Sequence, residues 1–133
     1  MGGIFILLLL SCQNGDSQSV DKETVGSTSK KEITSDEYQR WVNSHAVVVV
    51  DFSATWCGPC KKLSPLLEKI AERRTNDFKL YTIDVDENPE ISQRNEIEVL
   101  PTLIWYKNGK MAKRLFGYHD EKEINQMIDD LIK

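Results

Sequence analysis

The sequence predicts an α/β domain, a three-layer sandwich in which helices flank a central mixed β-sheet. Three observations support this prediction. Residues 46–52 form an almost continuous β-branched run, which is typical of a strand covered on both faces. A helical pattern follows this run directly, and strand and helix patterns then alternate. The last part of the chain has the pattern of a hairpin and a helix, so the sheet should begin parallel and end antiparallel.

The first helix should begin after Thr34 and run to about Ser44. Thr34 and Glu37 have the spacing of a capping box, in which the hydroxyl binds a free backbone N–H and the glutamate reaches back. The larger apolar side chains that follow share one helical face: Tyr38, Trp41 and Val42. The strand at 46–52 comes next.

A second helix is expected after Gly58-Pro59. Apolar side chains recur there at helical spacing: Leu63, Leu66, Leu67, Ile70 and Ala71. Pro65 lies inside this pattern and predicts a kink, because proline removes one backbone hydrogen bond of a helix.

The rest of the chain is predicted to contain a strand at 80–85, a short helix at 89–95 and a strand at 102–106. Asn108-Gly109 predicts a tight hairpin into a strand at 111–116. Asp120 and Glu123 have capping-box spacing before a last helix. The apolar stripe of that helix is interpreted as core packing and comprises Ile124, Met127, Ile128, Leu131 and Ile132.

Length and composition indicate one soluble globular domain. The chain has 133 residues, with 17 Lys and Arg against 21 Asp and Glu, for a net charge of -4. The mild acidity and the lack of a basic cluster argue against nucleic-acid binding. Three cysteines are too few for a disulfide-rich scaffold, and no apolar run approaches the length of a membrane-spanning helix.

The first residues resemble a bacterial lipoprotein signal. An apolar run at 4–10 leads into Leu9-Leu10-Ser11-Cys12, which is similar to a lipobox. The resemblance implies a signal peptide at 1–11, a lipid on Cys12, and a protein that is anchored to a membrane without spanning it. The alternative is a frayed hydrophobic N-terminus with an unmodified cysteine. Residues 12–29 are polar and are predicted to form a flexible tether before a domain at 30–133.

Two cysteines carry the chemistry that the sequence suggests. Cys57 and Cys60 lie at the junction between the central strand and the second helix, where open α/β sheets place their sites. At the start of a helix, free N–H groups and the helix dipole stabilise a thiolate. Cys57 should therefore be the nucleophile and Cys60 the resolving thiol, with Pro59 suited to the first helical turn.

From about residue 30 to 133 the chain resembles the thioredoxin family. The resemblance is carried by the run Asp51 to Lys61, which contains Trp-Cys-Gly-Pro-Cys, and by Leu100-Pro101-Thr102, Lys107-Asn108-Gly109 and Phe116-Gly117-Tyr118. It implies a thioredoxin fold and a thiol-disulfide oxidoreductase that reduces protein disulfides by a Cys57/Cys60 dithiol-disulfide cycle. The Gly-Pro pair between the cysteines resembles that of reducing members.

The resemblance also implies roles for other residues. Asp51 is similar to the family's buried carboxylate, which accepts the proton of Cys60, and Pro101 to its cis-proline. An apolar groove would hold an extended substrate chain and would be lined by Trp56, Gly58, Pro59, Leu100, Pro101 and Gly117. Departures from the familiar bacterial pattern, which bear on the redox potential and the pKa of Asp51, stand at Ser53, Thr55 and Thr82.

No cofactor is expected, and Cys57 with Cys60 supplies only two of the four ligands that zinc needs. The expected partners are disulfide-containing proteins and a thiol electron donor, and the expected state is a monomer. If exported, the protein would face the periplasm of the bacterial cell envelope and take electrons from a membrane thiol-disulfide transporter. If cytoplasmic, it would use thioredoxin reductase. Alternative functions are an envelope disulfide oxidase or isomerase and a non-catalytic thioredoxin-fold binding module.

Overall fold

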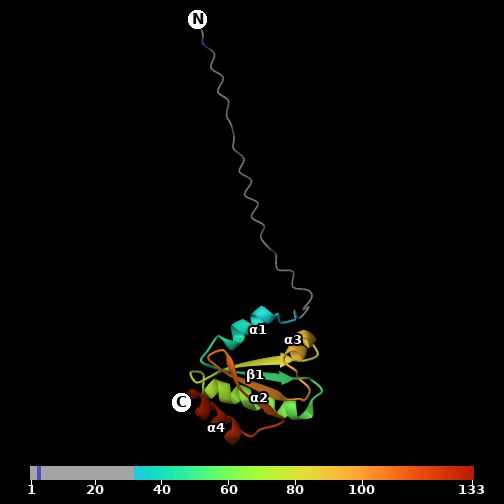
Figure 1. Cartoon of the computed structure of the whole chain (residues 1–133), viewed down its shortest axis with the longest axis vertical. Coiled ribbons are helices and arrows are strands. Elements are labelled where there is room, and N and C mark those ends of the chain that lie inside the picture. Colours follow the sequence, from blue (N-terminus) through green and yellow to red (C-terminus); the bar gives the residue numbers. More distant parts are fainter. Residues whose placement is uncertain (1–2, 4–31) are drawn as a thin grey trace.

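The computed structural model describes Gly3 and residues 32–133 (Figure 1). The predicted signal peptide at 1–11, apart from Gly3, the predicted tether and the predicted lipid site at Cys12 lie outside the described residues. The elements follow in the order α1 (Ser35–Val42), β1 (Val47–Ser53), α2 (Gly58–Arg73), β2 (Lys79–Asp84), α3 (Pro89–Arg94), β3 (Thr102–Lys107), β4 (Lys110–Phe116) and α4 (Glu121–Ile132).

The four strands form one mixed sheet in the order β2-β1-β3-β4. The first pair, β1 with β2, is parallel, whereas β3 runs antiparallel to both β1 and β4. Helices α2 and α4 cover one face, and α1 and α3 cover the other (Figure 1). The predicted three-layer α/β architecture is therefore confirmed, including its parallel beginning and antiparallel end.

The central strand β1 contributes to a core on each side of the sheet. Val47 and Val49 pack with α2 and α4, while Val48, Val50 and Phe52 pack with α1 and α3. All five side chains are at most 1% exposed. Their burial explains why the run is continuously apolar, because successive side chains of a strand point to opposite faces and both faces are covered here.

Local signals in the sequence set most element ends. Both predicted capping boxes form, at Thr34 with Glu37 and at Asp120 with Glu123. Asn108 and Gly109 both have positive φ, 50° and 77°, as the predicted tight hairpin between β3 and β4 requires. Other ends differ from the prediction by one or two residues, since helix ends fray and propensity does not define a strand's last hydrogen bond.

Helix α2 runs through Pro65 as one element, and the kink at this residue stays a prediction. In α4, Ile132 is 44% exposed, so its assignment to the core was wrong. Helical periodicity shows which face a residue lies on but not how far the opposing layer extends. Within residues 32–133, no helix is long and apolar enough to cross a bilayer.

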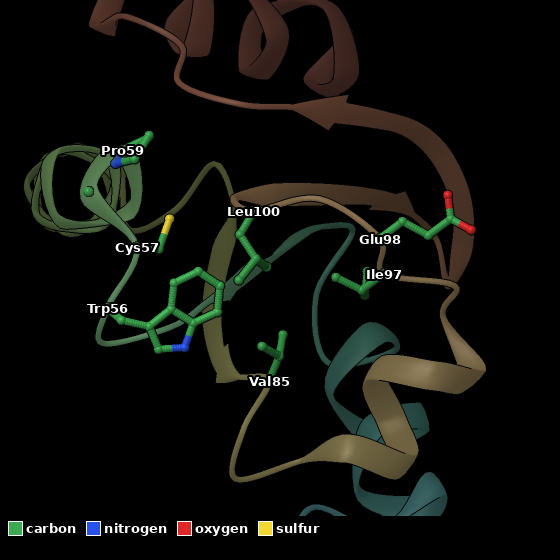
Figure 2. Close-up of a pocket in the computed structure, with 8 residues that line it drawn as sticks. Trp56, Cys57, Pro59, Val85, Ile97, Glu98 and Leu100 are labelled. Carbon is green, nitrogen blue, oxygen red and sulfur yellow. The ribbon is translucent and has the colours of Figure 1, made fainter.

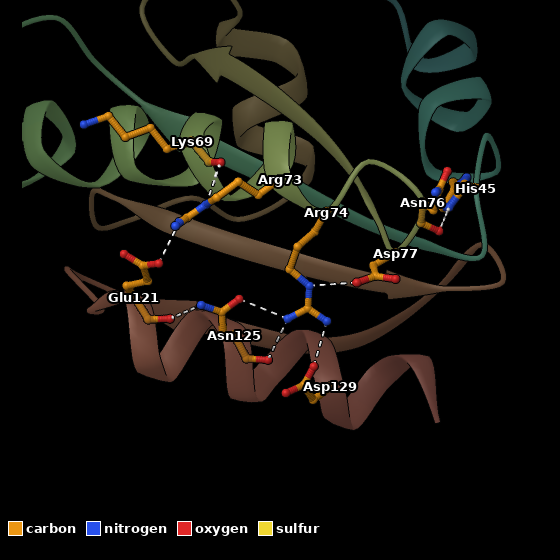
Figure 3. A network of polar contacts seen from close by, with 9 residues as sticks. All are labelled: His45, Lys69, Arg73, Arg74, Asn76, Asp77, Glu121, Asn125 and Asp129. Carbon is orange, nitrogen blue, oxygen red and sulfur yellow. Dashed lines mark hydrogen bonds and ion pairs between the residues drawn. The ribbon is translucent and has the colours of Figure 1, made fainter.

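Polar contacts of Arg74 tie the end of α2 to α4 (Figure 3). Its guanidinium donates from Nε to Asp77 Oδ2 at 2.7 Å, from Nη1 to Asn125 Oδ1 at 3.0 Å and from Nη2 to Asp129 Oδ1 at 2.7 Å. The neighbouring Arg73, the last residue of α2, forms an ion pair with Glu121 of α4. These contacts link the C-terminal end of α2, opposite the two cysteines, to α4.

Candidate active site

Cys57 and Cys60 lie at the N-terminus of α2, after β1 and a short connection. Cys57 is the N-cap residue, and its Sγ accepts a hydrogen bond from the backbone N–H of Cys60 at 3.3 Å. The two side chains form a disulfide, so the structure represents the oxidised protein. Cys57 is 5% exposed and Cys60 only 1%. An incoming sulfur can therefore reach Cys57 more easily, where the helix N-terminus also favours a thiolate.

Asp51 is buried in β1 on the face that α2 covers. It is 0% exposed and pairs in register with Thr82 of β2 and Leu103 of β3. Its Oδ2 accepts a hydrogen bond from Ser64 Oγ at 2.6 Å, and its Oδ1 has no partner among the described residues. A carboxylate in this position is poorly solvated, and the Ser64 hydroxyl is the one side-chain donor that stabilises its charged form among the described residues.

This environment alters the acidity of Asp51. The pKa of its carboxyl group is raised from 3.8 to about 6 as the net result of three effects: burial raises it, the hydrogen bond from Ser64 lowers it, and the negative charge of Glu68 raises it. Burial has the largest effect because it penalises the charged form. A carboxyl group with this pKa can take up and release a proton near neutral pH.

A groove of about 450 Å³ opens beside Cys57 (Figure 2). Its lining is mostly apolar and comprises Trp56, Cys57, Gly58, Pro59, Val85, Ile97, Glu98 and Leu100. Trp56 is 67% exposed, and its Nε1 donates to Asp86 Oδ2 at 2.7 Å. This bond orients a large apolar ring at the edge of the groove without burying it.

The structure gathers four of the six residues predicted to bind substrate around this groove: Trp56, Gly58, Pro59 and Leu100. Pro101 is buried and Gly117 is half-buried, and neither lines it. These two residues are joined by a hydrogen bond from the Gly117 N–H to the Pro101 carbonyl at 2.8 Å. The Leu100-Pro101 peptide bond is cis, as the resemblance implied.

Several residues around the site belong to no sequence motif and were not predicted from the sequence. Val85 and Ile97 line the groove from loops after β2 and α3, and Glu98 lies beside them. Val85 had a usable signal, because it follows a strand at the edge of the sheet where α/β proteins place their sites. Ser64 had one also, since it lies four residues after Cys60 on the same helical face.

A protein metal site needs several ligand side chains close together. Across Gly3 and residues 32–133, no three His, Cys, Asp or Glu side chains are grouped so that they could hold a metal ion.

Comparison with known proteins agrees with this geometry. The thioredoxin family model matches residues 29–130. The thioredoxin of Listeria monocytogenes is 37% identical over 102 residues, covering 77% of this chain and 98% of that protein. The thioredoxin of Mycobacterium tuberculosis is 40% identical over 91 residues, covering 68% and 78%.

Solved structures show the same likeness. A mutant thioredoxin of Halobacterium salinarum superposes with a TM-score of 0.71 at 30% identity, covering 77% of this chain and 88% of that one. Plasmodium falciparum thioredoxin superposes with a TM-score of 0.66 at 32% identity, covering 74% and 94%. Fold, cysteine pair and relatives agree, and the chain belongs to the thioredoxin family.

Proposed function

We propose that Cys57 is the attacking thiolate of this protein and that Cys60 resolves the mixed disulfide. Family membership and the cysteine pair make the protein a thiol-disulfide oxidoreductase that reduces protein disulfides. The assignment of the two cysteine roles rests on one observation. Cys57 caps α2 and borders the groove, whereas Cys60 lies deeper, one helical turn further on.

In the proposed cycle, the Cys57 thiolate attacks one sulfur of the substrate disulfide, and the other sulfur leaves as a thiolate. Asp51 takes the proton of Cys60, whose sulfur then attacks Cys57 Sγ and releases the second substrate thiolate. Two electrons pass from the enzyme dithiol to the substrate, and the Cys57-Cys60 disulfide remains. The pKa of Asp51, about 6, suits this proton transfer.

The redox potential tests the direction of this reaction. We expect a potential below about −200 mV for the Cys57/Cys60 pair, since reducing members lie near about −270 mV and strong oxidases near about −120 mV. It would be measured by equilibrating the protein with glutathione or dithiothreitol mixtures and quantifying the free thiols. The thioredoxin relatives support reduction, and a value near that of the oxidases would contradict it.

The groove is proposed to hold the polypeptide on each side of the substrate disulfide. Its apolar lining and the exposed Trp56 suit an extended peptide whose side chains alternate between groove and solvent. Glu98, which also lines it, would favour a basic side chain near the substrate cysteine. The predicted contacts of Pro101 and Gly117 with substrate remain part of the proposal.

Replacement of Trp56 tests the groove. Trp56→Ala is expected to raise the KM for a protein disulfide about tenfold, because an exposed aromatic anchor contributes about 1–2 kcal/mol. The rate with a small soluble disulfide should stay unchanged. Asp86→Asn should have a weaker effect of the same kind, since it disturbs only the ring orientation. Equal losses with both substrates would show that Trp56 serves the reaction centre instead of the groove.

For location, we propose a lipid anchor on Cys12 that holds the domain at the bacterial cell envelope, facing the periplasm. The proposal is supported by the apolar run that ends at the lipobox-like Leu9-Leu10-Ser11-Cys12. The polar segment at 12–29 would have a root-mean-square reach of about 20 Å, enough to hold the domain clear of the membrane. A membrane thiol-disulfide transporter would then be the electron donor.

Membrane fractionation tests the anchor. The full chain should sediment with membranes and carry an N-terminal lipid on Cys12, as seen by intact mass, while Cys12→Ser should become soluble. Single-chain lipidation alone binds membranes weakly, so stable sedimentation would indicate more than one chain. An unmodified cysteine and a soluble wild-type protein would favour the cytoplasmic alternative, with thioredoxin reductase as donor.

A further inference from the structure

A second hollow, of about 360 Å³, lies on the α2 side of the active site and does not coincide with the substrate groove. Its lining comes from α2, β2 and the connection after β1: Ser53, Ala54, Thr55, Cys60, Lys61, Ser64, Pro65, Glu68, Thr82 and Asp84. Cys60, Ser64 and Glu68 are spaced by four residues, which aligns them on one face of the helix. Cys60 and Ser64 therefore border the same hollow, although Cys60 itself is only 1% exposed.

Asp51 is not among the residues that line this hollow, although it lies directly behind it. Ser64 lies between Asp51 and the hollow. Its side chain is half-buried, lines the hollow, and donates a hydrogen bond from Oγ to Asp51 Oδ2 at 2.6 Å. Asp51 itself is 0% exposed, and its Oδ1 has no partner among the described residues. Within the described part of the chain, Ser64 is thus the side chain that both hydrogen-bonds the carboxylate and lines the hollow.

We propose that Ser64 is a positioning residue that orients the Asp51 carboxylate and carries its proton to water in the hollow. This inference rests on the proposed role of Asp51 as the proton acceptor of Cys60. When Cys60 gives up its proton, Asp51 becomes neutral. The Asp51 hydroxyl then donates to Ser64 Oγ while the Ser64 proton passes to water, so one proton enters the relay and one leaves, and no electrons move.

The charges around the relay suit this role. Lys61 and Glu68 of α2 and Asp84 of β2 line the hollow, whereas the partner of Asp51 in register on β3 is the apolar Leu103. Glu68 raises the pKa of Asp51, while the hydrogen bond from Ser64 lowers it. The serine therefore keeps the carboxylate ionised, and ready to accept a proton, at a lower pH than burial alone would allow.

The test compares Ser64→Ala with Ser64→Thr, which keeps a hydroxyl. Alanine is the best helix former, so loss of the helix is not expected. In the oxidised protein, the pKa of Asp51 followed by carboxyl-carbon NMR should rise by at least about one unit in Ser64→Ala, a tenfold change in proton affinity. Because the ionised fraction of Asp51 falls as its pKa rises, the rate of the resolving step should fall about tenfold at pH 5, only about twofold at pH 7, and recover at higher pH. Ser64→Thr should retain most of both properties.

Two further variants complete the experiment. Glu72→Gln removes an exposed carboxylate from the same helix, outside the hollow, and should change neither property. Glu68→Gln should lower the pKa of Asp51, because it removes a neighbouring negative charge. An unchanged pKa and pH profile in Ser64→Ala would overturn the inference, as would a Ser64→Thr variant that behaves like Ser64→Ala.

Asp51→Asn separates this inference from the proposed function on which it rests. If Asp51→Asn resolves the mixed disulfide at the wild-type rate, Asp51 is not the proton acceptor, and both proposals fail. If Asp51→Asn is slow while Ser64→Ala matches the wild type, the role of Asp51 stands and only the role of Ser64 is overturned.

Discussion

Cys57→Ser is expected to reduce protein disulfides at least about a thousandfold more slowly than the wild type, since it removes the nucleophile. A serine hydroxyl in place of the thiol cannot form the mixed disulfide. Cys60→Ser should behave differently, because Cys57 remains at the N-terminus of α2 and can still attack. It should accumulate a stable mixed disulfide with the substrate, visible on a non-reducing gel and by intact mass.

The matched control is Cys12→Ser, which removes the third cysteine of the chain and should leave the reduction rate unchanged. Trapping of substrate on Cys60 in Cys57→Ser, at the rate seen for Cys57 in Cys60→Ser, would contradict the assignment of roles. Full activity in both variants would contradict the dithiol mechanism itself.

Asp51→Asn is expected to stabilise the oxidised protein by about 2–3 kcal/mol at pH 8 and by little at pH 4. Folding raises the pKa of Asp51 from 3.8 to about 6, so the folded chain binds this proton more tightly than the unfolded chain. Binding of this proton therefore stabilises the folded wild type. Its contribution to the free energy of unfolding is fully present below about pH 4 and is lost as pH rises through about 6. That difference in pKa corresponds to about 3 kcal/mol of unfolding free energy. The expected gain is somewhat smaller, because the asparagine amide of the variant would be buried without all of its hydrogen bonds.

Urea unfolding of the oxidised wild type and Asp51→Asn, at pH 4 and pH 8, would measure this difference. Glu72→Gln serves as control, because it removes an exposed carboxylate from α2 and should change stability little at either pH. A stability gain of the same size at both pH values would show that the effect comes from packing and not from ionisation. The gain in stability should accompany slower resolution of the mixed disulfide, since the same buried charge is proposed to accept the proton.

The sequence predicted the order and type of every element in the described part of the chain, because each has a local signal. Two capping boxes mark the beginnings of α1 and α4, and Asn108-Gly109 marks the β3–β4 turn. The four valines of β1 also indicate a strand covered on both faces, and their burial confirms this. The exposed Ile132 shows the limit of such signals, since periodicity does not tell where the opposing layer ends.

The two cysteines and the aspartate were also visible in the sequence, but the surroundings that decide their chemistry were not. Ser64 contacts Asp51 across 13 residues of sequence, and Asp86 binds Trp56 across 30. Val85 and Ile97 reach the groove from two different loops. Spacing places Ser64 on the helical face of Cys60 and Val85 at the end of a strand, but the contacts themselves depend on how α2, β2 and α3 pack against β1.

The sequence by itself thus determined the fold class, the cysteine pair and its place at the start of a helix, because strand burial, helix capping and the Cys-Gly-Pro-Cys motif are local properties of the chain. Only the tertiary structure decided which side chains line the groove, which hydroxyl holds Asp51, and that this carboxyl group has a pKa of about 6. The physical reason is that solvation and hydrogen bonding depend on neighbours in space, and the sheet brings together residues that are far apart in sequence.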